Sequence, residues 1–137
     1  MSTRAQIGVY EKKPENVKEL ENYEVLLYRH SDGYPDGVLP ELEKFLKFWE
    51  KARGITDTEY CGARLLQYMC NEMDGIYGKD FMLEDKNNLT GIYSYGICKN
   101  LHGDIEYYYA IYPSAIDIYE QNSSEWSGLK LLKTINI

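Results

Sequence analysis

The spacing of apolar residues changes twice along this chain, and this change constrains the fold more than any other feature. Residues 5–10 and 23–30 have the short apolar runs and flanking turn residues that are typical of strands. Between residues 38 and 73, apolar residues recur every three or four positions, which is typical of helices. Strand-like runs return in the C-terminal part. The order ββ-αα-βββ therefore predicts an α+β fold, in which an antiparallel sheet carries two helices on one face.

The helical region is expected to form two helices separated by a turn. The first begins at about residues 38–40, where a proline is tolerated in the first turn, and it ends at Arg53-Gly54. The second spans about residues 57–73, and an Asp-Gly pair follows it. The first helix is expected to face the core with a single apolar stripe, formed by Leu42, Phe45, Leu46 and Trp49.

The C-terminal part is expected to complete the sheet. Residues 79–88 are polar and are interpreted as a long exposed loop that precedes it. The expected strands cover residues 90–98, 105–112, 115–120 and, at an edge of the sheet, 129–137. The chain has 137 residues, which is enough for one domain with its own core, so residues 1–137 are expected to form a single α+β domain.

The composition limits the partners and the compartment. The net charge of −7 argues against binding to extended nucleic acid, but it leaves room for a small anionic ligand held by a few arginines. The odd number of cysteines, without C-x-x-C spacing, indicates reduced thiols in a cytoplasmic protein and no zinc site. No apolar run approaches the roughly 18 residues of a membrane span, and the N-terminus lacks an export signal. No phosphate-loop, dinucleotide or nucleophile motif occurs, so we expect no cofactor.

Two His-x-Asp motifs are the clearest candidates for chemistry. His30 precedes Asp32 by two positions and His102 precedes Asp104 by two, and residues spaced in this way point to one face of an extended chain. If the pairs converge, each aspartate could orient its histidine as a base, or the groups could bind a divalent metal together with Glu106. The alternative is local, because aspartate beside glycine is also a common turn former.

Arginine and tyrosine residues near these motifs indicate a binding surface. The guanidinium groups of Arg4, Arg29 and Arg64 suit phosphate or carboxylate, and tyrosines such as Tyr28 and Tyr34 could stack on a base. Because Arg29 alternates with Tyr28 along its strand, the two are expected on opposite faces. The alternatives are an internal salt bridge for each arginine and plain sheet packing for the 14 tyrosines.

Longer blocks of sequence surround the two motifs. They are Arg4-Ala5-x-Ile7, Tyr28-Arg29-His30-x-Asp32-Gly33-Tyr34-Pro35, Gly37-Val38-Leu39-Pro40, Gly62-Ala63-Arg64-Leu65, Tyr95-Gly96-Ile97 and Leu101-His102-Gly103-Asp104-Ile105-Glu106-Tyr107. Together they cover most of positions 4–120 and resemble a family of small, largely uncharacterised proteins of phages, archaea and bacteria. Ser31 departs from that family, which often has tryptophan there. The resemblance implies an accessory role for a virus or mobile element, such as evasion of host defence, and implies no particular reaction.

These features together predict a non-catalytic binding protein, with no metal, that forms homo-oligomers and engages a small, nucleotide-like anionic ligand or a host protein. The residues expected to bind are Arg4, Tyr28, Arg29, His30, Asp32, Tyr34, Arg64, His102 and Asp104. One alternative is a hydrolase or nuclease that uses both His-x-Asp pairs, with or without a divalent metal. Another is a protein-interaction module that uses an exposed sheet edge or a helix face.

Overall fold

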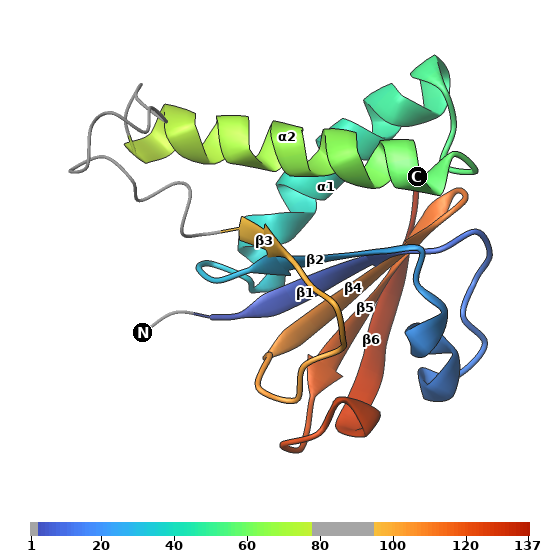
Figure 1. The fold of residues 1–137 in the computed structure, drawn as a ribbon, viewed down its shortest axis with the longest axis vertical. Helices are drawn as coiled ribbons and strands as arrows, with labels where there is room; N and C mark the ends of the chain where they lie inside the picture. Colours follow the sequence, from blue (N-terminus) through green and yellow to red (C-terminus); the bar gives the residue numbers. More distant parts are fainter. Residues whose placement is uncertain (1–2, 78–94) are drawn as a thin grey trace.

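The computed structural model describes residues 3–77 and 95–137 and confirms the α+β fold (Figure 1). Both helices lie on the same side of the sheet, as predicted. The elements within these residues are β1 (Ala5–Val9), the 3-10 helix η1 (Val17–Asn22), β2 (Val25–Arg29), α1 (Pro35–Ala52), α2 (Thr58–Tyr77), β3 (Tyr95–Ile97), β4 (Tyr107–Tyr112), β5 (Ala115–Gln121), the 3-10 turn η4 (Trp126–Gly128) and β6 (Leu129–Asn136).

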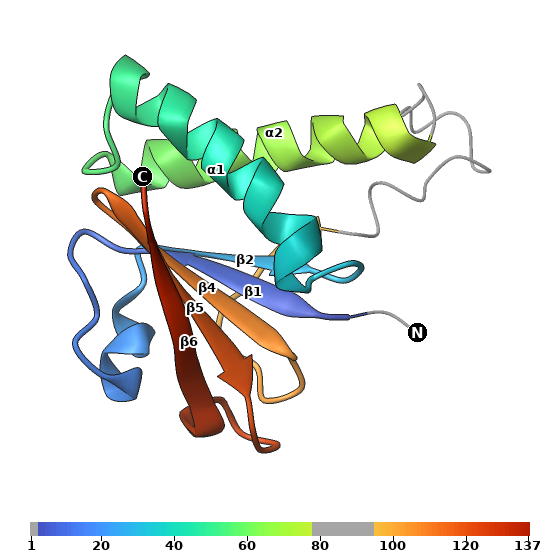
Figure 2. The same ribbon diagram turned by 180° about the vertical axis from the view of Figure 1, so that it is seen from behind.

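The six described strands form one sheet in the order β3-β2-β1-β4-β5-β6. Every neighbouring pair is antiparallel, including the predicted pair β1 and β2, except that β1 and β4 run parallel. The parallel pair arises because the chain returns from the helices to β3, beside β2, and then crosses to the far side of β1 (Figure 2). As a result β1 lies inside the sheet, and all five of its residues are buried.

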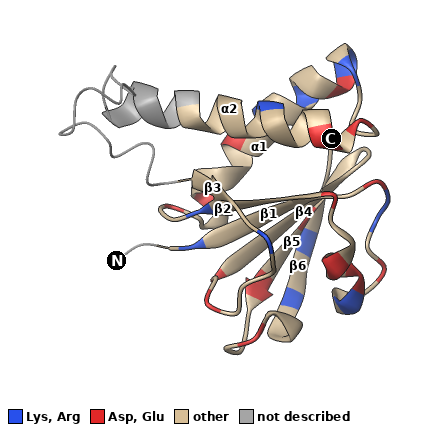
Figure 3. Ribbon diagram, in the orientation of Figure 1, with Lys and Arg blue, Asp and Glu red and all other residues tan. Residues whose placement is uncertain are grey.

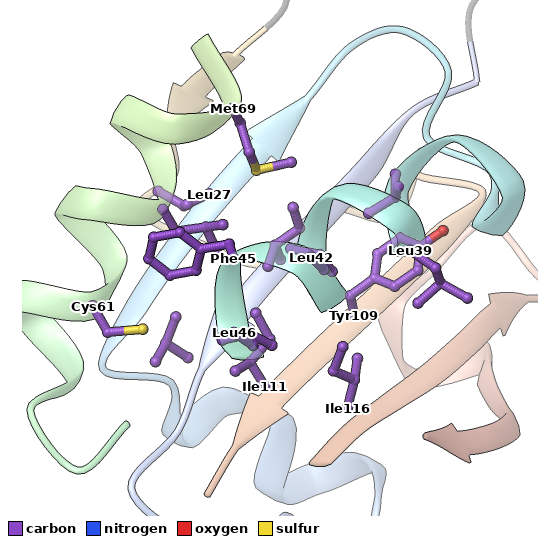
Figure 4. Close-up of a cluster of buried hydrophobic side chains, with 14 of the residues drawn as sticks. Leu27, Leu39, Leu42, Phe45, Leu46, Cys61, Met69, Tyr109, Ile111 and Ile116 are labelled. Atoms are coloured by element: carbon purple, nitrogen blue, oxygen red, sulfur yellow. The ribbon is translucent and has the colours of Figure 1, made fainter. Parts of the chain in front are cut away.

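The helices and the sheet enclose the main hydrophobic core (Figure 4). Alternate residues of the central strands, such as Ile7, Leu27 and Ile111, meet the inner side of α1 and α2. The predicted apolar stripe of α1 is confirmed, because Leu42, Phe45, Leu46 and Trp49 are all buried in this core. Burial of such side chains contributes roughly 1.5–3 kcal/mol each.

The opposite face of the sheet carries a second core that is rich in tyrosine. Tyr10, Tyr108, Tyr112 and Tyr119 are buried there together with Leu20 of η1. The hydroxyl groups of Tyr10 and Tyr108 bond to each other, Tyr10 Oη donates to the Leu20 carbonyl over 2.6 Å, and Tyr112 Oη donates to Asp117 Oδ1 over 2.8 Å. For these tyrosines the structure therefore favours sheet packing over a ligand wall.

The helix bounds differ from the predicted ones. α1 begins at Pro35 instead of residues 38–40, because the extended Tyr34 caps it and proline suits the first helical position. Its end at Arg53-Gly54 is confirmed, since Gly54 has a φ of 86° and the amides of both residues bond to the Trp49 carbonyl. α2 continues to Tyr77, past the Asp-Gly pair expected to end it, which shows that an isolated glycine was tolerated in the helix. The predicted loop 79–88 and the first part of the predicted strand 90–98 lie outside the described residues.

Candidate functional site

Five of the nine predicted binding residues gather at one corner of the sheet, where β1 begins, β2 ends and the chain approaches β4. They are Arg4, Tyr28, His30, His102 and Asp104, and contacts connect all of them through Tyr28 or Arg4. Glu106 belongs to the same group because it accepts a hydrogen bond from the Arg4 backbone. We call these six residues the Tyr28 cluster.

The Tyr28 ring is the centre of the cluster, and both histidines lie beside it. Its centroid lies 5.9 Å from that of His30 and 5.8 Å from that of His102, with the rings tilted by 48° and 51°. Tyr28 Oη lies 2.8 Å from His30 Nδ1 and forms a hydrogen bond with it. His30 follows Tyr28 by two positions, so strand alternation puts both on the face away from the helices. The two histidines, 72 positions apart in sequence, thus share one aromatic neighbour.

His102 is held beside Tyr28 by a residue that the sequence reasoning missed. Gln6 of β1 is completely buried, and its side chain bonds twice to the chain that precedes β4. Its Oε1 accepts from the His102 backbone N–H over 2.8 Å, and its Nε2 donates to the Asn100 carbonyl over 3.1 Å. The available signal was a glutamine inside an otherwise apolar strand, since a buried amide needs partners from elsewhere in the fold.

Charged groups gather around Arg4 at the edge of the cluster. Arg4 Nη1 lies 2.8 Å from Asp104 Oδ2, and the Arg4 backbone N–H donates to Glu106 Oε2 over 2.6 Å. Asp104 also approaches His102, with Nδ1 and Oδ1 3.9 Å apart. The Arg4 Nε is buried and has no hydrogen-bond partner within the described part of the chain. The cluster therefore holds a cation with an unused donor beside two exposed carboxylates.

The environment of Tyr28 keeps its hydroxyl group protonated. Partial burial raises the pKa of Tyr28 above its ordinary value, the Arg4 cation opposes this shift, and the Asp104 carboxylate adds to it. At neutral pH the Tyr28 hydroxyl can therefore donate or accept a hydrogen bond, which suits binding better than nucleophilic attack.

Asp32 and Tyr34 lie in the turn that leads into α1. Asp32 is exposed and has a φ of 54°, a left-handed conformation that aspartate tolerates. Tyr34 is 41% exposed and caps α1 through its backbone, without a side-chain bond. The turn is fixed by Gly33, whose N–H donates to the Thr3 carbonyl and whose carbonyl accepts from Tyr109 Oη. A Cβ at that glycine would lie 2.7 Å from the Thr3 carbonyl oxygen, so the close approach requires glycine.

Arg29 and Arg64 do not join the histidines. Arg29 is 3% exposed on the helix side of the sheet, where Nη1 lies 2.6 Å from Glu41 Oε2 and Nε donates to the Ser31 carbonyl. The internal salt bridge considered for each arginine is therefore present for Arg29. Arg64 lies exposed on α2, over the ring of Tyr60. Of the three predicted arginines, Arg4 alone meets the histidines.

The cluster offers stacking surfaces, hydrogen-bond donors and one arginine. Among residues 3–70 and 95–137, no group of three or more His, Cys, Asp or Glu side chains is arranged to hold a metal ion. The convergence of both histidines on one ring leaves two chemical uses open: an aromatic ligand can stack there, or the histidines can act as proton carriers.

No protein-family model, curated protein or solved structure matches this chain. The resemblance drawn from the sequence blocks therefore stays a prediction. None of the helices in the described ranges is both long enough and apolar enough to cross a membrane.

Proposed function

We propose that this chain is a non-catalytic binding protein whose Tyr28 cluster holds a small anionic ligand with a flat ring, such as a nucleotide. The observation that carries this proposal is the meeting of Tyr28, His30 and His102 beside Arg4. Rings tilted toward one another offer faces for a base, and base–aromatic stacking contributes about 1–3 kcal/mol per base. The arginine beside them supplies the charge that a phosphate requires.

The present partner of Arg4 can give way to a ligand. The ion pair between Arg4 and Asp104 is half exposed, with side-chain exposures of 39% and 65%, and such pairs contribute only about 0–1 kcal/mol. A phosphate that replaced Asp104 would therefore lose little, because the planar guanidinium offers its exposed end to a phosphate as well as to a carboxylate.

Calorimetric titration with linear and cyclic nucleotides tests the proposal. We expect heat with at least one nucleotide, a loss of affinity of about tenfold or more for Arg4→Gln, and a similar loss for Tyr28→Leu. The matched control is Arg64→Gln, which removes an exposed arginine outside the cluster and should leave the affinity unchanged. The absence of heat with every nucleotide, or an equal loss in the control, would refute the small-ligand proposal.

A hydrolase or nuclease is the second candidate, and the shared position of His30 and His102 favours it. His102 also has a carboxylate 3.9 Å away that could orient it. The same nucleotides, incubated with and without Mg²⁺, Mn²⁺ or Zn²⁺, should then yield products separable by chromatography. If the protein is such an enzyme, His30→Ala and His102→Ala should each abolish turnover. Nucleotides that stay intact after long incubation would exclude this candidate.

We also propose that the protein acts in the cytoplasm as a homo-oligomer and serves a virus or mobile element. The three cysteines are free thiols, which agrees with a reducing compartment. β6 is an edge strand of the sheet and has two exposed leucines, Leu131 and Leu132, and an edge strand of this kind can pair with another copy. Light scattering coupled to size exclusion measures the mass in solution, and a monomer at all concentrations would remove the oligomer proposal.

A further inference from the structure

A second surface lies on the two helices. The Tyr28 cluster lies on the opposite face of the sheet. α1 and α2 cross over the sheet (Figure 2). Side chains of both helices line an open groove of about 390 Å³. We call it the helix groove. Its main lining residues are Phe45, Phe48, Trp49 and Ala52 of α1 with Arg64 and Tyr68 of α2.

The lining of the helix groove is largely aromatic. Phe48 is 66% exposed, which is unusual for so large an apolar side chain, and Tyr60 beside the groove is 44% exposed. Three rings are stacked here: the Trp49 centroid lies 5.7 Å from that of Phe45 and 6.2 Å from that of Tyr60, with interplanar angles of 13° and 20°. Aromatic anchors held in place by packing are the usual centres of protein interfaces.

The segments that form the helix groove have more basic than acidic residues, although the chain as a whole is acidic. Arg53 and Arg64 lie 4.3 and 5.1 Å from the centroid of the Tyr60 ring. Figure 3 shows further basic residues along the second half of α1. Residues 44–64 contain the cations Lys44, Lys47, Lys51, Arg53 and Arg64 against the acids Glu50, Asp57 and Glu59, whereas the whole chain has a net charge of −7.

Two of these three acids already have partners, and one of those partners is the cation Arg53 itself. Asp57 accepts from Arg53, and Glu50 accepts from the Ser114 backbone. The same cations lower the pKa of Tyr60, with Arg64 as the larger cause. An incoming negative charge would therefore meet a positive rim on both helices.

We propose that the helix groove binds an acidic amphipathic helix of a partner protein. A third helix packs naturally between two crossed helices, with its apolar face on the aromatic lining and its carboxylates on the rim. A second copy of this chain is a poorer occupant, because a symmetric contact would place each positive rim against itself. This inference goes beyond the proposed ligand site and does not depend on it.

Selection from a display library of random 18-residue peptides, with the full chain as bait, tests the proposal. We expect the selected peptides to carry apolar residues at i, i+3, i+4 and i+7 and a net negative charge. Their circular dichroism spectrum should show an increase in helix content on binding. Phe48→Ser should weaken their binding about tenfold or more, and Arg64→Gln should weaken it less. Added salt should weaken binding to the wild-type chain as well.

Ile97→Ser is the matched control, since Ile97 is a 75%-exposed apolar residue on β3, outside the helix groove. Its binding should equal that of the wild type, and each variant is first checked for native circular dichroism. The proposal is overturned if no selected peptide depends on Phe48, or if the selected peptides are basic, neutral or extended. A dimer that Phe48→Ser dissociates would also overturn it, because a second copy would then occupy the groove.

Discussion

The ion pair between Arg29 and Glu41 tests whether Arg29 stabilises the fold, as its burial indicates, or is available to bind a ligand as Arg4 is. Arg29 is 3% exposed and Glu41 15% exposed, with Nη1 and Oε2 2.6 Å apart. The pair joins the end of β2 to α1. Replacement of Glu41 by glutamine keeps the shape of the side chain and a hydrogen-bond acceptor but removes the negative charge.

The expected cost follows from the burial of Arg29. Removing one partner of a buried ion pair destabilises a protein by about 3–5 kcal/mol, because the remaining charge is left without compensation. Arg29 would keep its bond to the Ser31 carbonyl and its position 5.5 Å from the Tyr95 ring centroid. We therefore expect Glu41→Gln to lower the free energy of unfolding by about 3 kcal/mol, at the lower end of that range.

Equilibrium unfolding in urea measures this loss. With a slope of about 2 kcal/mol/M, the midpoint should fall by about 1.5 M. The matched control is Asp57→Asn, because Arg53 and Asp57 form a pair of similar length, 2.7 Å, that is 49% and 42% exposed. Its loss should stay below about 1 kcal/mol. A double variant, Arg29→Met with Glu41→Leu, should recover much of the lost stability, because it buries no charge.

Equal midpoints for Glu41→Gln and Asp57→Asn would refute this reasoning. They would mean that Arg29 is well solvated in solution and that its contact with Glu41 contributes little. Arg29 would then return to the candidate ligand residues, and Arg29→Gln would belong beside Arg4→Gln in the nucleotide titrations. A loss of about 3 kcal/mol would instead assign Arg29 to packing.

Four further predictions follow from the structure. Burial raises the pKa of the Cys61 thiol to about 12, so at pH 8 a disulfide reagent should leave Cys61 unmodified in the native protein and modify it in urea. Burial raises the pKa of Tyr119 to about 12 against an ordinary 10, so its contribution is complete below pH 10 and about 2 kcal/mol is lost by pH 12; the difference in urea unfolding between the wild type and Tyr119→Phe across that range measures this loss. Arg64→Gln should raise the pKa of Tyr60, because the guanidinium now lowers it, and ultraviolet titration of the phenolate detects the change. Gln6→Ala should cost about 1–3 kcal/mol and shift the NMR resonances of the His102 ring, since two bonds that hold that segment are lost.

Local periodicity accounts for the parts of the fold that were predicted correctly. The stripe on α1 and the alternation of Arg29 with Tyr28 depend on side-chain directions that a helix or a strand imposes on near neighbours. Both could be derived without knowledge of the rest of the chain. The start of α1 at Pro35 was missed because a stretch of turn formers can also be the first turn of a helix when an extended residue precedes its proline.

Contacts between distant residues explain what the sequence did not reveal. The parallel pairing of β1 with β4 depends on the path of the whole chain, and no pattern within either strand distinguishes it from an antiparallel pair. The position of His102 depends on its backbone hydrogen bond to Gln6, 96 positions earlier. The sequence does not show which polar groups the buried amide of Gln6 bonds to. Strand alternation could group Tyr28 with His30, but it could not bring His102 to them.

The two proposed surfaces can be separated by experiment because the sheet and α1 lie between them. Tyr28 and His30 belong to the face away from the helices, whereas Phe48 and Arg64 line the outer side of those helices. Distant sites without shared partners usually contribute additively, so Phe48→Ser should leave nucleotide affinity unchanged and Arg4→Gln should leave peptide affinity unchanged. If the affinities prove coupled, the direct connection is the Arg29–Glu41 pair, since Arg29 lies between Tyr28 and His30 at the end of β2 and its partner lies one turn before Phe45 in α1. Coupling that disappears in the Arg29→Met, Glu41→Leu variant would identify that pair as the link between ligand and partner.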